Sequence, residues 1–171
     1  VPTDLQGRAR IIAREELVLC GLPLAATVMA TVDAACRFVP AVEDGASLVD
    51  GDVVATIEGS VRSLLTAERT MLNFLSHLSG VATEARRFAR AVEGTGAVVV
   101  DTRKTTPGLR YWEKRAVVYG GCANHRFGLF DLVLIKNNHL TAAGGVREAV
   151  RAAQAARPHY MRIEVEVESE A

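Results

Sequence analysis

The chain has 171 residues, enough for one compact domain or two small ones, which excludes a miniprotein held together by disulfides. Hydrophobic residues make up 49% and charged residues 23%, ordinary globular values that argue against a wholly disordered chain. Twenty Lys and Arg balance twenty Asp and Glu, so no overall charge draws the chain to nucleic acid or to an anionic membrane.

The sequence gives no sign of membrane insertion, secretion or disulfide formation. Its longest charge-free apolar stretch, 17–32, is interrupted by Gly21 and Pro23, and it is shorter than the roughly 18 to 20 residues of a membrane span. The N-terminus VPTDLQGRAR lacks the apolar segment of a signal peptide. Three widely spaced cysteines form no CxxC pair: Cys20, Cys36 and Cys122. We expect a soluble, cytoplasmic protein with no membrane or nucleic-acid partner.

The first third of the chain is typical of a small α+β unit. Residues 8–20 combine apolar runs with two consecutive isoleucines, which indicates a strand. Apolar residues at helical spacing predict a helix over 23–36, with Pro23 in the first turn, where no N–H partner is lost. Residues 37–61 hold short β-branched pieces separated by Asp-Gly and Glu-Gly turn signals. These features predict an antiparallel sheet with one helix.

A long amphipathic stripe follows the predicted sheet. From residue 62 to Val92, apolar residues recur three, four or seven positions apart. This spacing indicates one long helix, or two helices joined near Ser79 and Gly80. Two glycines shortly after Val92 are expected to end it.

Beyond this helix, strands and helices alternate. We predict strands at 97–102, 131–136 and 162–167, a polar segment with a helix over 105–120, and a helix at 146–157. This order indicates parallel βαβ units. Three strands with two crossovers do not close a barrel, which needs about eight strands in its commonest form. We therefore expect the chain to stop partway through such a domain.

Basic residues gather where the predicted parallel strands end. Arg103 and Lys104 follow the first strand, Lys136 ends the second, and His125 and Arg126 lie in the loop that enters it. Ligands of parallel α/β folds lie at the carboxyl ends of the strands. Arginine grips a carboxylate or phosphate through paired hydrogen bonds, and lysine adds a mobile charge. The pattern predicts a concave site for a ligand with several anionic groups.

For part of this cluster, roles that involve no ligand remain open. Arg110, Lys114 and Arg115 fall on a helical pattern, and we interpret them as a solvated helix face. His125 alone would be a hydrogen-bonded structural histidine. Its neighbour Arg126 leaves a structural role and an anion-binding role equally open for both residues.

The last predicted strand supplies carboxylates. Glu164, Glu166 and Glu168 alternate with Val165 and Val167, so the glutamates share one face of the strand. We expect the valines to pack on helices and the glutamates to point into a barrel, where an unpaired carboxylate is costly. The glutamates must then be paired, hydrogen-bonded or bound to a hard cation such as Mg²⁺. For Glu164 we favour a purely structural ion pair.

Five segments of the chain follow one another in the order and spacing of a known family: TAERTMLNFLSHLSGVAT, DTRKTTPGLR, NHRFGLFD, LIKNNHLTAAGG and IEVEVES. Together they resemble quinolinate phosphoribosyltransferase, and the resemblance covers essentially the whole chain. It implies an α/β fold: an N-terminal α/β sandwich domain over 1–68, then over 69–171 the first part of an incomplete TIM-like α/β barrel. It also implies a homodimer or higher oligomer, with active sites between subunits.

The resemblance further implies the reaction and its residues. Phosphoribosyl pyrophosphate and quinolinate would give nicotinate mononucleotide, carbon dioxide and pyrophosphate with the help of Mg²⁺, a step of NAD biosynthesis. The family's quinolinate-binding positions fall on Arg69, Arg103, His125, Arg126 and Lys136. Arg69 would act across the dimer interface. The positions on the phosphoribosyl pyrophosphate side fall on Lys104 and Glu166, with Glu166 near the metal; the catalytic candidates are Lys104, Lys136 and Glu166.

The chain departs from the family pattern in two respects. Asn137 stands where the family usually has Asp after the lysine that ends the strand. The family's leader helix, a further acidic metal-side residue and the phosphate-binding loops have no counterpart in the 171 residues. We therefore expect a partial protein whose isolated chain is inactive.

Two other functions remain open alternatives. One is a paralogous pyrophosphorylase-like protein that acts on a different ring acid. The other is a noncatalytic half-barrel scaffold, in which the basic cluster merely pairs with the strand glutamates. A lipoyl-like module is disfavoured, because no lysine lies at an exposed hairpin within 37–61.

Overall fold

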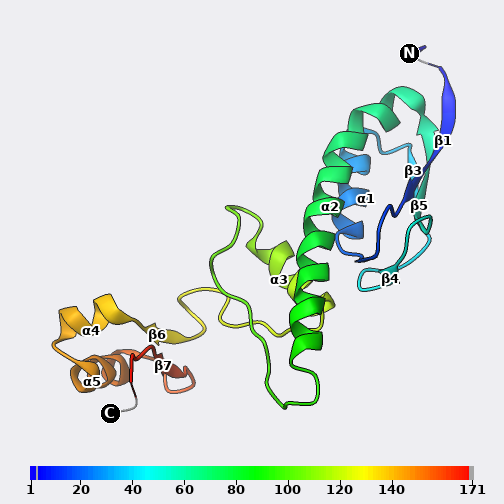
Figure 1. Cartoon of the computed structure of the whole chain (residues 1–171). Helices are drawn as coiled ribbons and strands as arrows, with labels where there is room; N and C mark the ends of the chain where they lie inside the picture. The colour runs from blue at the N-terminus through cyan, green and yellow to red at the C-terminus, as the bar shows by residue number, and fades with distance from the viewer. Residues whose placement is uncertain (3, 170–171) are drawn as a thin grey trace. The chain divides into compact units, whose positions relative to one another are not determined.

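The computed structural model describes residues 1–2 and 4–169 (Figure 1). The chain divides into two compact units, Val1–Asn124 and His125–Ala171. The mixed α/β class predicted from the sequence is confirmed in both units. In the described part of the chain, no helix combines the length and the apolar character needed to cross a membrane.

The first unit is built on a three-stranded antiparallel sheet in the order β1 (Gln6–Ile12), β5 (Val53–Ser60) and β3 (Arg37–Pro40). Two further short strands, β2 (Leu17–Val18) and β4 (Ser47–Leu48), pair antiparallel with each other. The register places Arg8 opposite Glu58, with Nε 3.3 Å from Oε1. The antiparallel sheet predicted for this part of the chain is thereby confirmed.

The single strand predicted over 8–20 is wrong in its middle. β1 ends at Ile12, because Ala13 bonds to a turn instead of continuing the ladder. The Ala13 N–H donates to the Asp52 carbonyl at 2.9 Å, and the Ala13 carbonyl accepts from the Gly51 N–H at 3.0 Å. The chain then resumes an extended course only at β2.

Two helices cover one face of this sheet, α1 (Leu22–Val32) and α2 (Val61–Ala91) (Figure 1). α1 ends earlier than predicted, since Asp33 adopts an extended conformation and its carboxylate accepts from the Ala35 N–H at 3.0 Å. α2 is one continuous helix of 31 residues, which decides between the two alternatives left open by the sequence.

The core of the first unit lies between the sheet and these helices. Its buried apolar side chains come from both layers: Leu19, Leu22, Met29, Val54, Ile57, Leu64, Met71 and Leu75. Burying a side chain of this size contributes about 1.5 to 3 kcal/mol. The core therefore fixes α2 against the sheet and holds the rest of the helix in place.

The remainder of the first unit contains one helix and little strand. α3 (Arg110–Tyr119) packs on α2. The strand predicted over 97–102 is wrong: this segment makes only an isolated parallel bridge, between Val100 and Ala123. Val98 and Val100 are exposed, so the alternating valines do not line a core. The polar segment with a helix predicted over 105–120 is confirmed: the helix begins at residue 110, after Gly108 with its positive φ of 79°.

The second unit contains one parallel βαβ arrangement. Its elements are β6 (Val133–Ile135), α4 (Asn137–Ala143), α5 (Val146–Ala156) and β7 (Ile163–Val165). β6 and β7 pair in parallel, which confirms the parallel strands predicted here, although both are shorter than expected. α4 was not predicted. Two paired strands are not a barrel, and no barrel is formed within residues 4–169.

Candidate functional site

Residues 101–106, here called the cationic loop, carry two of the predicted site residues in the first unit. Arg103 is half-buried and Lys104 is exposed. The Lys104 N–H donates to Thr102 Oγ1 at 3.0 Å, which fixes the turn between the two. Arg103 Nε is buried and has no hydrogen-bond partner among the described residues. A buried donor of this kind is available to an anionic ligand.

The start of the cationic loop is tied to α3 by an ion pair. Lys114 Nζ lies 2.5 Å from Asp101 Oδ1, and the two side chains are only 3% and 7% exposed. In the amide orientation that satisfies both of its polar atoms, Asn124 donates to Asp101 Oδ2 at 2.7 Å and to the Lys114 carbonyl at 3.0 Å. The interpretation of Lys114 as a solvated residue is therefore wrong.

The other two basic residues of α3 are also engaged. Arg110 Nε donates to Thr105 Oγ1 at 3.1 Å, and its Nη2 donates to the Arg103 carbonyl at 3.4 Å. Arg115 Nη2 donates to the Tyr119 hydroxyl at 2.9 Å. Both side chains are partly buried, so a purely solvated face does not describe them either.

The end of the cationic loop is held by Glu113. Its Oε2 accepts from the Thr106 N–H at 3.1 Å, and its Oε1 lies 2.8 Å from His77 Nε2 on α2. Burial alone would raise the pKa of the Glu113 carboxyl, but the hydrogen bonds from Thr106 and His77 outweigh it and lower that pKa. Glu113 is therefore an anionic bridge between α2 and the loop.

The second unit carries the other predicted cations beside the strand glutamates. Lys136 Nζ lies 2.9 Å from Glu166 Oε2, and His125 Nε2 lies 2.8 Å from Glu164 Oε2. Arg126 Nη1 donates to the Leu132 carbonyl at 3.2 Å. The expectation that these two glutamates are paired is confirmed. Their side chains are about half exposed, however, so the expectation that they are buried in a barrel is wrong.

Parallel pairing explains why these side chains meet. β6 and β7 place Leu134 opposite Glu164, and the Glu166 N–H donates to the Ile135 carbonyl at 2.9 Å. Opposed residues in a parallel pair lie on the same face of the sheet. Lys136, directly after β6, thus reaches Glu166, directly after β7. Glu168 is exposed; Val165 is half-buried, whereas Val167 is 52% exposed, so the valine face packs only in part.

Lys136 also forms the junction between β6 and α4. Its N–H donates to His139 Nδ1 at 2.9 Å, a side-chain acceptor for a donor at the start of a helix. Asn137 is the first residue of α4, and its carbonyl accepts from Thr141 Oγ1 at 3.0 Å. The helix therefore fixes the backbone from which Lys136 projects.

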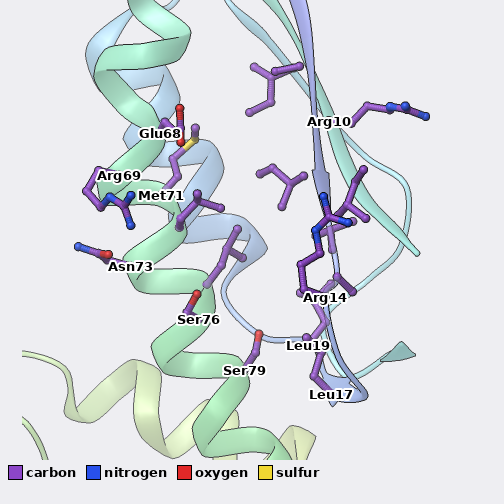
Figure 2. Close-up of a pocket in the computed structure, with 18 of the residues that line it drawn as sticks. Arg10, Arg14, Leu17, Leu19, Glu68, Arg69, Met71, Asn73, Ser76 and Ser79 are labelled. Carbon is purple, nitrogen blue, oxygen red and sulfur yellow. The ribbon is translucent and has the colours of Figure 1, made fainter. Parts of the chain in front are cut away.

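Arg69 lies on the exposed side of α2, apart from the cationic loop in the sequence. It lines a cavity of about 910 Å³ between β1 and α2 (Figure 2). Arg10 and Arg14 line it from the side of the strand (Figure 2), and Leu64, Met71 and Leu75 of α2 are among its apolar lining residues. The sequence pattern by itself would assign Arg69 to a solvent-facing helix surface.

The described residues form no cluster of three or more His, Cys, Asp or Glu that could hold a metal ion. Glu164 and Glu166 present exposed carboxylates on one face, which are hard oxygen ligands. Mg²⁺ commonly binds one or two protein carboxylates together with substrate phosphates. The donor set fits a cation brought by a phosphate ligand, and it does not fit a cage made of protein alone.

Sequence reasoning found both groups of cations but missed what holds the cationic loop. Asp101, Glu113 and His77 were not singled out, and Lys114 was interpreted as solvated. The sequence carries no clear signal for these contacts, because Glu113 and Lys114 are ordinary charged residues of a helical segment and only the structure shows that they are buried.

Comparison with known proteins identifies the family. Residues 1–79 match the model described as Quinolinate phosphoribosyl transferase, N-terminal domain, and residues 81–171 match the C-terminal domain model of the same family. The nicotinate-nucleotide pyrophosphorylase (carboxylating) of Mycobacterium leprae is 46% identical over 171 residues, which cover 99% of this chain and 60% of that protein.

Solved structures agree with the sequence matches. NadC from Streptococcus pyogenes superposes with a TM-score of 0.93 at 44% identity, over 99% of this chain and 60% of that one. The nicotinate-nucleotide pyrophosphorylase from Francisella tularensis gives a TM-score of 0.91 at 39% identity, over 98% and 59%. The chain thus spans about 60% of the length of these relatives. It belongs to the quinolinate phosphoribosyltransferase family.

Proposed function

We propose that the complete protein transfers a phosphoribosyl group from phosphoribosyl pyrophosphate to quinolinate. Carbon dioxide is lost, and nicotinate mononucleotide and pyrophosphate are formed. Family membership supports this reaction. The single observation that carries the proposal is Arg103, a guanidinium with a buried, unpartnered Nε on a loop that buried ionic contacts hold in place.

The charge of the substrates explains the residue set. Quinolinate is a dianion and the phosphoribosyl donor carries several further negative charges, so binding both requires many cationic donors. We assign quinolinate to Arg103, His125, Arg126 and Lys136, and we assign Arg69 to the same ligand in the partner subunit of a homodimer. Arginine and lysine provide short, charge-assisted hydrogen bonds to carboxylates, about twice as strong as neutral ones.

Lys104 and Glu166 are assigned to the phosphoribosyl pyrophosphate side. The bond between the ribosyl carbon and pyrophosphate breaks, and negative charge grows on the leaving group, where Lys104 stabilises it. The pyridine nitrogen attacks the ribosyl carbon and becomes cationic. When the 2-carboxylate leaves as carbon dioxide, its bonding electron pair stays on ring carbon 2, where the adjacent cationic nitrogen stabilises it, and a proton from water then takes the place of the carboxylate.

The chain's own residues supply binding, orientation and charge. Arg103 and Lys136 hold the carboxylates so that the ring nitrogen lies in line with the ribosyl carbon, which removes much of the entropic cost of reaction. Lys136 shares its charge with Glu166 in this structure, and we assign Glu166 to the metal side. A bound Mg²⁺ would neutralise charge on the pyrophosphate.

The architecture of the complete protein is part of the same proposal. Residues 1–68 would form an α/β sandwich domain, and 69–171 would begin a TIM-like barrel that further chain completes. The βαβ arrangement of the second unit supports that reading. The three free cysteines fit a reducing, cytoplasmic setting.

Substitution of Arg103 by alanine tests the proposal. Loss of a charge-assisted bond should weaken quinolinate binding by about 1.5 to 3 kcal/mol, roughly a 10- to 150-fold higher dissociation constant. Titration calorimetry on the complete protein measures this change. Arg115→Ala, on the neighbouring helix, should leave the constant unchanged. An Arg103→Ala protein with the parental constant, or a parent that binds nicotinate and not quinolinate, would refute the assignment.

A further inference from the structure

We infer that Glu113 and Lys114, two adjacent buried charged residues of α3, are positioning residues that clamp the two ends of the cationic loop. They act through the loop and touch no substrate themselves. The inference rests on the proposed function, because the loop carries Arg103 and Lys104. It concerns contacts within the first unit only.

Lys114 fixes the start of the loop. Its Nζ lies 2.5 Å from Asp101 Oδ1 with both side chains almost fully buried. The Asp101 N–H in turn donates to the Ala123 carbonyl at 3.1 Å, so backbone and side chain of Asp101 are both held. The Asn124 amide adds a bond to the second carboxylate oxygen at 2.7 Å. Arg103 thus lies two residues after Asp101, whose backbone and side chain are both held.

Glu113 fixes the end of the loop. It accepts the Thr106 N–H at 3.1 Å and is itself bound to His77 of α2 at 2.8 Å. α2 is the longest helix of the described structure and is packed on the core of the unit. Through Glu113, Thr106 is therefore connected to α2, which packs on the core of the unit.

Arg110 binds the middle of the loop. It donates to Thr105 Oγ1 at 3.1 Å and to the Arg103 carbonyl at 3.4 Å. One helix, α3, therefore contacts the loop at residues 101, 103, 105 and 106. The side chains of Arg103 and Lys104 remain uninvolved in these contacts, which use loop backbone and other side chains.

A stabilising role alone does not explain this arrangement. Burying charged groups is costly, and apolar residues of similar volume commonly hold a helix as well or better. Ionic contacts differ in being directional, since they fix the position of specific atoms. Two oppositely charged residues side by side, each bonded to a different end of one short loop, are therefore suited to fixing its geometry.

Lys114→Met in the complete protein tests the inference. It removes the charge and keeps the length of the side chain, so Asp101 loses its ion-pair partner. We expect the dissociation constant of quinolinate to rise about ten-fold or more, and amide hydrogens of 101–106 to exchange about ten-fold faster without substrate, because the loop is no longer anchored. Both are measured at a temperature where circular dichroism shows a fully folded variant.

Two control variants separate positioning from general stability. Met29→Ala removes a fully buried core side chain of α1; it should lower the melting temperature and leave both the quinolinate constant and loop exchange unchanged. Arg115→Met alters the next residue of α3 and should also leave both unchanged. Should Lys114→Met fail to fold, Glu113→Gln replaces it, with faster exchange at Thr106 as the expected result.

The outcomes distinguish this inference from the proposed function. A folded Lys114→Met protein with parental loop exchange and parental quinolinate binding overturns the clamp. Faster loop exchange in a protein whose parent does not bind quinolinate supports the clamp and overturns the proposed function instead. If Met29→Ala weakened quinolinate binding as much as Lys114→Met does, the effect would come from general destabilisation. Lys114 would then have only a structural role.

Discussion

Single residues show how strongly burial alters chemistry in this chain. Cys20 is 1% exposed in the core of the first unit, and burial together with the nearby charge of Asp44 raises the pKa of its thiol from 9.0 to about 12. Cys36 also has a raised pKa, mainly through burial. Because the thiolate is the reactive form, such thiols are protected at neutral pH.

Alkylation should therefore discriminate among the cysteines. At pH 8 in the native protein, iodoacetamide should modify Cys20 far more slowly than in urea, where all three thiols react alike. Peptide mass spectrometry measures the rates. The raised pKa also makes stability depend on pH. The native state keeps a proton that the unfolded chain releases near pH 9, so the contribution of Cys20 to the free energy of unfolding is full below pH 9 and is lost as pH rises through about 12. Fast native labelling of Cys20 would contradict its burial.

Residue types were easier to predict from the sequence than their partners. Lys136 could be found because it directly follows the apolar strand β6, and a residue in that place is a usual site position. The same rule pointed to Arg103 and Lys104, although the strand predicted before them does not form. The partner of Lys114 could not be found: Asp101 is 13 positions away, and only the fold brings the two together. A period-two pattern also could not show that the side chains of Glu164 and Glu166 are half exposed.

At the scale of elements, α2 organises the first unit. Ser79 Oγ accepts from the Cys20 N–H at 3.0 Å, and Thr83 Oγ1 accepts from the Val18 N–H at 2.9 Å. Both bonds tie the helix to the segment around β2. They also explain why a helix with glycine at position 80 continues, although glycine costs about 1 kcal/mol in a helix.

Ser79→Ala tests this docking. It leaves the Cys20 N–H buried without its acceptor, which should lower the free energy of unfolding by about 1 to 3 kcal/mol. Urea denaturation of the complete protein measures the change. Ser76→Ala, an exposed serine on the same helix, serves as the control and should stay within about 0.5 kcal/mol of the parent. Equal effects of the two substitutions would argue against the bond.

Helices whose apolar residues recur with a clear helical period were predicted well. Elements that depend on partners far away in the sequence were not. The stripe of α2 and the helical run of α5 carry their own signal. The valines at 97–102 have strand composition, but among the residues that the structure describes they make a single bridge, to Ala123, and no strand forms. The start of α1 was predicted to within one residue, but its anchor was not: Asp44 Oδ1 accepts from the Gly21 and Leu22 N–H groups at 3.0 Å each, more than 20 positions along the chain.

At the scale of the whole molecule, a neutral chain carries locally charged sites. The first unit provides the cationic loop, and the second provides cations that share their charge with strand glutamates. The chain spans about 60% of its relatives, so the complete protein is the proper object for every test of activity. The family match and the geometry of Arg103 support the proposal that, in the complete protein, quinolinate is the acceptor and loses its 2-carboxylate.

Labelled quinolinate tests that claim most directly. The complete protein is incubated with phosphoribosyl pyrophosphate, Mg²⁺ and quinolinate carrying carbon-13 in one carboxylate at a time, and carbon dioxide and nucleotide are analysed by mass spectrometry. Label in the 2-carboxylate should appear in carbon dioxide, one for each nicotinate mononucleotide formed, and label in the 3-carboxylate should stay in the nucleotide. Nucleotide formed from nicotinate but not from quinolinate, or no labelled carbon dioxide at all, would contradict the claim.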